Sequence, residues 1–82
     1  MWYVYIIKCS DRSLYTGVTT DIERRIGEHN AGKAARYTQG RTPVRLVHDE
    51  NHPDRSKALK REAEIKSWPR YKKLALIKED YD

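Results

Sequence analysis

The sequence holds a single cysteine, Cys9, so the chain can form no intrachain disulfide, which fits a reducing compartment. A lone cysteine at the end of an apolar segment usually packs as a small hydrophobic residue, and we assign Cys9 no chemical role. No apolar run is long enough to cross a membrane. The apolar start also lacks the basic leader and the cleavage site of a signal peptide. We therefore expect a cytoplasmic protein that does not associate with membranes.

The length leaves room for one domain. We expect residues 1–82 to form it, with an acidic tail at about 78–82. A hydrophobic fraction of 38% is enough for a globular fold, although a domain of this size has a thin core.

Positive charge is unevenly distributed along the chain. The net charge is +5, and residues 33–73 contain twelve Lys or Arg against five acids. A basic region of this kind predicts a polyanionic partner, above all nucleic acid. Charge alone does not distinguish DNA from RNA.

Hydrophobic periodicity and turn residues predict an α+β fold with the order β-β-α-β-α-α. A small antiparallel or mixed sheet covered by helices is the architecture that this order favours. Thr19 or Thr20 can cap the first helix and Gly32 can end it, while residues 33–43 read as a loop that can hold one helical turn. The predicted elements are strands at 2–9, 14–19 and 44–50, and helices within 19–32, 57–68 and 70–80.

The first predicted helix places charged and apolar residues on one stripe. Neighbours on a helix face recur three and four positions along, which groups Ile22, Arg25, Ile26 and His29. The two isoleucines can face the sheet, so Arg25 and His29 lie at the margin of the buried side.

The second predicted helix carries a carboxylate inside its apolar stripe. Glu62 falls between Ala58 and Ile65 on that face, with Leu59 beside them. Such a carboxylate is costly unless it is paired or binds a metal. The pattern leaves both a buried salt bridge with an arginine and a metal ligand open.

Two tyrosine motifs in the predicted hairpin resemble those of the GIY-YIG nuclease domain. The first counterpart is "VYI", which carries Tyr5, and the second is "YTG", which carries Tyr15 and Gly17. Tyr3 and Val4 stand where the family name has Gly and Ile. The resemblance extends over residues 2–77, and it implies a three-stranded antiparallel sheet flanked by helices.

The resemblance continues in order through the rest of the chain. Arg25 matches the family's helix arginine, His29 a histidine often seen one turn later, and Tyr37 a polar loop position. Glu62 lies where the family has its metal-binding glutamate. The catalytic set implied by the resemblance is therefore Tyr5, Tyr15, Arg25, His29 and Glu62.

These residue types suit phosphodiester hydrolysis, as the resemblance implies. Glu62 could hold one Mg²⁺ or Mn²⁺, and Arg25 could bind phosphate, although a surface salt bridge is its ordinary role. Tyr5 would activate water if Arg25 and the metal lowered its pKa, or if it passed its proton to His29. Tyr15 would orient water or phosphate. Core packing is the alternative for both tyrosines.

Other residues complete the prediction. Gly17 would allow a close approach of backbone or substrate, or mark a strand bulge. We expect Trp2 and Trp68 in the core, and His48 and His52 on the surface without partners at metal-ligand spacing. The expected nucleic-acid-binding set is Gly17, Lys33, Arg36, Tyr37, Arg41 and Arg45.

The sequence thus predicts a metal-dependent endonuclease, with DNA as substrate and a preference for structure over sequence. Repair and recombination are both compatible with it. We expect a monomer or weak homodimer that could need a protein partner for targeting. The alternative is a non-catalytic nucleic-acid-binding or repair-complex interaction module that retains the fold.

Overall fold

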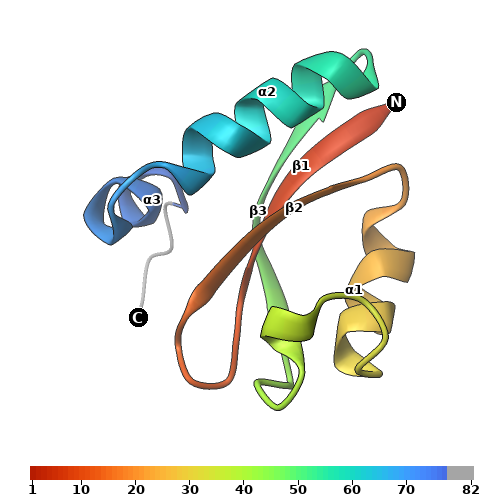
Figure 1. Ribbon diagram of the computed structural model, residues 1–82, viewed down its shortest axis with the longest axis vertical. Helices are drawn as coiled ribbons and strands as arrows, with labels where there is room; N and C mark the ends of the chain where they lie inside the picture. The colour runs from red at the N-terminus through yellow and green to blue at the C-terminus, as the bar shows by residue number, and fades with distance from the viewer. Residues whose placement is uncertain (78–82) are drawn as a thin grey trace.

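Three antiparallel strands form the centre of the protein, whose computed structural model describes residues 1–77. They are β1 (Trp2–Lys8), β2 (Leu14–Thr19) and β3 (Arg45–His52), and the sheet order is β2-β1-β3 (Figure 1). The predicted α+β class and element order are confirmed. The expected acidic tail at 78–82 lies outside the described residues.

The helices also follow the predicted order. They are α1 (Ile22–Asn30), the 3₁₀ turn η1 (Arg36–Thr38), α2 (Arg55–Lys66) and α3 (Arg70–Ile77). The prediction of Thr19 or Thr20 as the α1 cap is wrong. Asp21 is the N-cap, and its side chain accepts a hydrogen bond from the backbone N–H of Arg24. The Thr19 hydroxyl instead accepts from the backbone N–H of Asp21. Among residues 1–77, no helix is both long and apolar enough to cross a membrane.

The alternation of side chains along β1 creates two small cores, one on each face of the sheet. Val4 and Ile6 face α2 and α3, and they pack with Ala58, Ile65 and Ile77. The predicted core tryptophans, Trp2 and Trp68, are half-buried against this cluster. The opposite face is covered by α1, as Figure 1 shows. Its buried cluster consists of Tyr5, Ile7, Cys9 and Val44, packed against Tyr15, Ile22 and Ile26.

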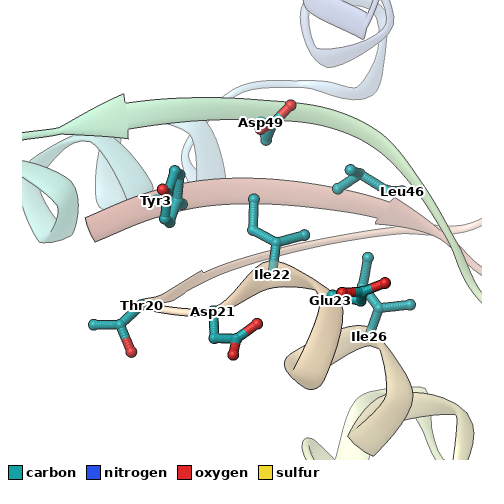
Figure 2. A pocket seen from close by; sticks show the side chains of 8 residues that line it. All are labelled: Tyr3, Thr20, Asp21, Ile22, Glu23, Ile26, Leu46 and Asp49. Carbon is teal, nitrogen blue, oxygen red and sulfur yellow. The ribbon is translucent and has the colours of Figure 1, made fainter. Parts of the chain in front are cut away.

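The helix α1 has two different flanks. Figure 2 shows the flank toward β3, where Ile22 and Ile26 approach Tyr3 and Leu46 across a hollow. Among the described residues that line this hollow, the charged ones are the acids Asp21, Glu23 and Asp49. The other flank carries Arg25 and His29 toward β2 and α2.

His48 and His52 do not lie exposed on the surface, contrary to prediction. Both are on the sheet face covered by α2, and their side chains are 18% and 20% exposed. They bracket Glu50, with Nε2–carboxylate distances of 2.9 Å for His48 and 3.3 Å for His52. Arg61 of α2 donates two hydrogen bonds of 2.9 Å to the same carboxylate. This network joins β3 to α2, and the hydrogen bonds from Arg61 are the main reason why the pKa of Glu50 falls to about 2.

Candidate active site

One small pocket of 160 Å³ brings the five predicted catalytic side chains together. Tyr5 comes from β1 and Tyr15 from β2, while Arg25 and His29 come from α1 and Glu62 from α2. Gly17, Val18, Ala34 and Ala35 complete the lining. Segments as far apart in sequence as residues 5 and 62 therefore meet at a single site.

Gly17 makes room for the Tyr5 side chain. The two residues are direct partners in the β1–β2 ladder. A Cβ atom at position 17 would lie 2.6 Å from the Tyr5 hydroxyl oxygen and 2.8 Å from its Cζ. The close approach expected at Gly17 is thus made by the Tyr5 phenol, and the β1–β2 register runs through this position without a bulge.

A buried chain of hydrogen bonds runs inward from Tyr5. Its hydroxyl lies 2.8 Å from Nε2 of His29, and Nδ1 of His29 lies 2.8 Å from the hydroxyl of Thr38. Tyr5, His29 and Thr38 are only 2%, 1% and 0% exposed. The sequence placed Tyr5 and His29 in the site but missed Thr38, which belongs to η1.

Burial governs the proton affinities of this pair. It raises the pKa of Tyr5, with a further contribution from Tyr15, and the opposing effect of Arg25 is smaller. Burial and then Arg25 lower the pKa of His29. Without a metal, Arg25 therefore does not lower the pKa of the Tyr5 phenol below its ordinary value. Of the two routes left open by the sequence, proton transfer to His29 is the one for which the contact is present. Tyr5 is a neutral phenol beside a neutral imidazole at physiological pH.

The Arg25 side chain makes an ion pair and also has one nitrogen without a partner in the described part of the chain. Its Nη1 lies 3.4 Å from the Glu28 carboxylate, and the two side chains are 34% and 37% exposed. Its Nε is buried without a hydrogen-bond partner in the described part of the chain. A buried donor without an acceptor is costly, and an oxygen of a bound phosphate would satisfy it.

Glu62 is 16% exposed and its ion-pair partner is a lysine, not the arginine of the salt-bridge alternative that the pattern left open beside a metal ligand. Lys66 Nζ lies 3.1 Å from Glu62 Oε2, one helical turn away. Within residues 1–77, no group of three or more His, Cys, Asp or Glu side chains could hold a metal. A single carboxylate fits a divalent cation that takes its other ligands from water and phosphate, as Mg²⁺ commonly does.

Aromatic and cationic side chains are stacked next to the pocket. The Tyr37 ring stacks on Tyr15 with centroids 5.9 Å apart, and the Arg41 guanidinium lies 4.2 Å from the Tyr37 ring centroid. Arg41 also binds Asp11 at 2.9 Å and the Tyr37 carbonyl at 2.7 Å. Tyr15 in turn meets the His29 ring edge-on at 5.3 Å. These contacts support one side of the site.

The remaining predicted nucleic-acid-binding residues lie at different distances from this pocket. Lys33 and Arg36 are exposed on the segment that follows α1, next to the lining residues Ala34 and Ala35. Arg45 lies at the start of β3 and lines a separate hollow with Lys8 and Arg12. Lys33 and Arg36 are thus chain neighbours of residues that line the site, whereas Arg45 lines another hollow.

Comparisons with known proteins show to which family the chain belongs. The sequence model of the GIY-YIG catalytic domain matches residues 1–75. The chain is 64% identical over 80 residues to a UPF0213 protein of Haloquadratum walsbyi, covering 98% of this chain and 90% of the relative.

Two solved structures are also similar. A solution NMR structure of a UPF0213 protein from Bacillus halodurans is 49% identical with a TM-score of 0.61, covering 94% of this chain and 83% of that one. The solution NMR structure of a protein from E. faecalis is 37% identical with a TM-score of 0.56, covering 98% and 91%. On these matches in sequence and fold, the chain belongs to the GIY-YIG catalytic domain family, a family of nucleases.

Proposed function

We propose that this chain is a divalent-metal-dependent endonuclease that hydrolyses phosphodiester bonds. The observation that carries the proposal is the convergence of Tyr5, Tyr15, Arg25, His29 and Glu62 on one pocket. Phosphodiester hydrolysis needs a proton acceptor for water, positive charge at the phosphate and help for the leaving oxygen. Each need has a matching side chain in this pocket.

Arg25 binds the phosphate in this proposal. Its unpartnered Nε gives it a donor that is already desolvated and directed by the protein. A guanidinium can bind two phosphate oxygens at once, which the point charge of a lysine cannot reproduce. The Glu28 carboxylate lies 3.4 Å from Nη1 of Arg25 and limits the rotation of the guanidinium.

Tyr5 and His29 handle the proton of the attacking water. The Tyr5 oxygen takes a proton from water while its own proton passes to His29 Nε2, 2.8 Å away. The phenol is too basic to be ionised beforehand, so the two transfers must be coupled. Tyr15, beside the His29 ring, orients the water or the phosphate.

Glu62 is the residue that would hold the cation. Nucleases of this family generally use a divalent metal. Bound there, Mg²⁺ or Mn²⁺ would polarise the phosphate and stabilise the departing 3′ oxygen. Lys66 must then give up its contact with the carboxylate, or share it.

DNA with a distorted or branched structure is the substrate class that we propose. Lys33 and Arg36 are exposed and flank the pocket-lining residues Ala34 and Ala35 in the chain, so they could contact the phosphate backbone, which gives affinity without reading bases. The acidic flank of α1 in Figure 2 would repel phosphates, so the strand would approach from the Arg25 side. A protein partner could supply further targeting in repair or recombination.

The test is cleavage of labelled single strands, duplexes, flaps and junctions, as DNA and as RNA, with Mg²⁺, Mn²⁺ or EDTA. Glu62→Gln and Arg25→Lys should abolish cutting. Matched controls come from the same helices: Glu64→Gln and Arg24→Lys change the same residue types away from the pocket. Cutting that survives in Glu62→Gln, or that ignores EDTA, would overturn the proposal.

One observation favours the alternative of a non-catalytic nucleic-acid-binding or interaction module. The Lys66 ammonium lies where a cation bound to Glu62 would be expected, and a structural ion pair needs no metal. Binding of DNA that is equal in the parent protein and Glu62→Gln, with no cutting of any substrate, would favour this module.

A further inference from the structure

The Thr38 hydroxyl has one proton, and the structure shows where it goes. Thr38 Oγ1 lies 3.0 Å from the backbone carbonyl oxygen of Ala35, the residue that precedes η1. A carbonyl oxygen can only accept, so Thr38 must be the donor in this bond. Toward His29 Nδ1, 2.8 Å away, the same hydroxyl is left with lone pairs only.

The direction of that bond fixes the tautomer of His29. Nδ1 must carry the hydrogen that is donated to Thr38, and Nε2 of the neutral ring then has a lone pair. Tyr5 therefore donates its proton to Nε2 across the 2.8 Å contact. The bonds all run one way, from Tyr5 through His29 and Thr38 to the Ala35 carbonyl.

We propose that Thr38 is a positioning residue, which holds His29 as the Nδ1–H tautomer so that Nε2 stays available for the proton of Tyr5. The catalytic consequence rests on the proposed nuclease function, but the tautomer itself does not. Without the Thr38 hydroxyl, the buried Nδ1–H of His29 would have no hydrogen-bond acceptor, which would destabilise this tautomer. The other tautomer would place a hydrogen on Nε2 and point it at Tyr5, leaving no acceptor for the phenol proton.

The proton balance of the step shows why the tautomer matters. One O–H bond of water breaks as its oxygen bonds to phosphorus, while the P–O3′ bond breaks and the 3′ oxygen leaves with that electron pair and takes a proton from solvent. The proton of the attacking water passes to the Tyr5 oxygen. The Tyr5 O–H bond breaks at the same time, and a new N–H bond forms at His29 Nε2. The imidazolium keeps its Nδ1–H bond to Thr38. With Nε2 already protonated, the phenol proton has no destination.

The experiment measures the tautomer directly, with long-range ¹H–¹⁵N correlation spectra of the His29 ring in the full chain. The native protein should show Nδ1 protonated and Nε2 unprotonated above the pKa of His29. Thr38→Ser should keep this pattern, and Thr38→Val should lose it. Thr20→Val, at an exposed position, is the control. In Tyr5→Phe the Nδ1–H tautomer should persist, because Thr38 sets it.

Three results would overturn the proposal: an Nε2–H tautomer in the native protein, an unchanged tautomer in Thr38→Val, or a reversed one in Tyr5→Phe. If Thr38→Val does not fold, the spectra of the native protein and of Tyr5→Phe still test the proposed tautomer. In cleavage assays, Thr38→Val should lower kcat about 10²-fold with little change in KM, and Thr38→Ser should restore it. A protein that shows the expected tautomer but cuts nothing would contradict the nuclease function alone.

Discussion

Replacing Gly17 by alanine should displace the Tyr5 phenol from His29. The new Cβ would lie 2.6 Å from the Tyr5 hydroxyl oxygen, whereas ordinary contact begins at 3.4 Å. The phenol must therefore retreat by about 0.8 Å, the difference between those two distances. If the retreat is directed away from His29, the present 2.8 Å bond opens beyond hydrogen-bond range.

The cost should appear in both stability and activity. Overpacking of this kind destabilises by roughly 1–3 kcal/mol, because neighbouring side chains leave their preferred positions. A shift of about 1 Å at a reacting group can lower the rate by about 10²-fold. Urea denaturation measures the first effect, and single-turnover cleavage of the best substrate measures the second.

Gly27→Ala is the matched control, because a Cβ at that position of α1 meets nothing within 4 Å. It should leave cleavage unchanged and stabilise the exposed helix by up to about 1 kcal/mol. A second variant, Gly17→Ala combined with Tyr5→Phe, should recover part of the lost stability, since it removes the hydroxyl that is crowded most closely. Native stability and native cleavage in Gly17→Ala would refute the steric argument.

Two further predictions concern the carboxylates. Lys66→Met should raise the affinity for Mn²⁺ by up to about fivefold, because it removes a half-exposed ammonium that competes with the cation for Glu62. Titration calorimetry measures this affinity, and Lys60→Met is the control. An unchanged affinity would contradict the competition between Lys66 and the metal. Glu50 has a pKa of about 2 in the folded protein, against an ordinary 4.5, so it stabilises the fold above about pH 4.5 and loses that effect as the pH falls toward 2. Ionised Glu50 contributes up to about 3 kcal/mol to the free energy of unfolding. In urea denaturation, Glu50→Gln should therefore lose less stability between pH 5 and pH 3 than the parent protein does. An equally steep loss in the variant would show that other groups cause it.

Local signals in the sequence were sufficient for the order of the elements and for the faces on which the helix residues of the candidate site lie, whereas Tyr5 and Tyr15 were assigned to the site through the resemblance to the family. The helical spacing of Arg25 and His29 placed both on the flank of α1 that faces the pocket. The position of Glu62 between Ala58 and Ile65 placed it on the buried side of α2, where it is 16% exposed. In these cases the periodicity of one helix determines which side chains share a face.

Residues whose role depends on contacts between distant segments could not be found in this way. Thr38 lies in a loop with no periodic pattern, and its partner His29 is nine residues away on another element. His48, Glu50 and His52 alternate along β3, but only the bidentate contact from Arg61 on α2 explains why they cluster. Lys66 was also missed, although its position one helical turn after Glu62 is a local signal that could have found it.

The most direct test of the account is the metal-dependent cleavage rate of Glu62→Gln relative to Glu64→Gln, on one labelled DNA junction in saturating Mn²⁺. The account predicts that the control cuts like the parent protein and that Glu62→Gln does not cut. Equal cutting by the two variants would contradict the assignment of the active site, and no cutting by the parent protein on any substrate would contradict the nuclease function itself.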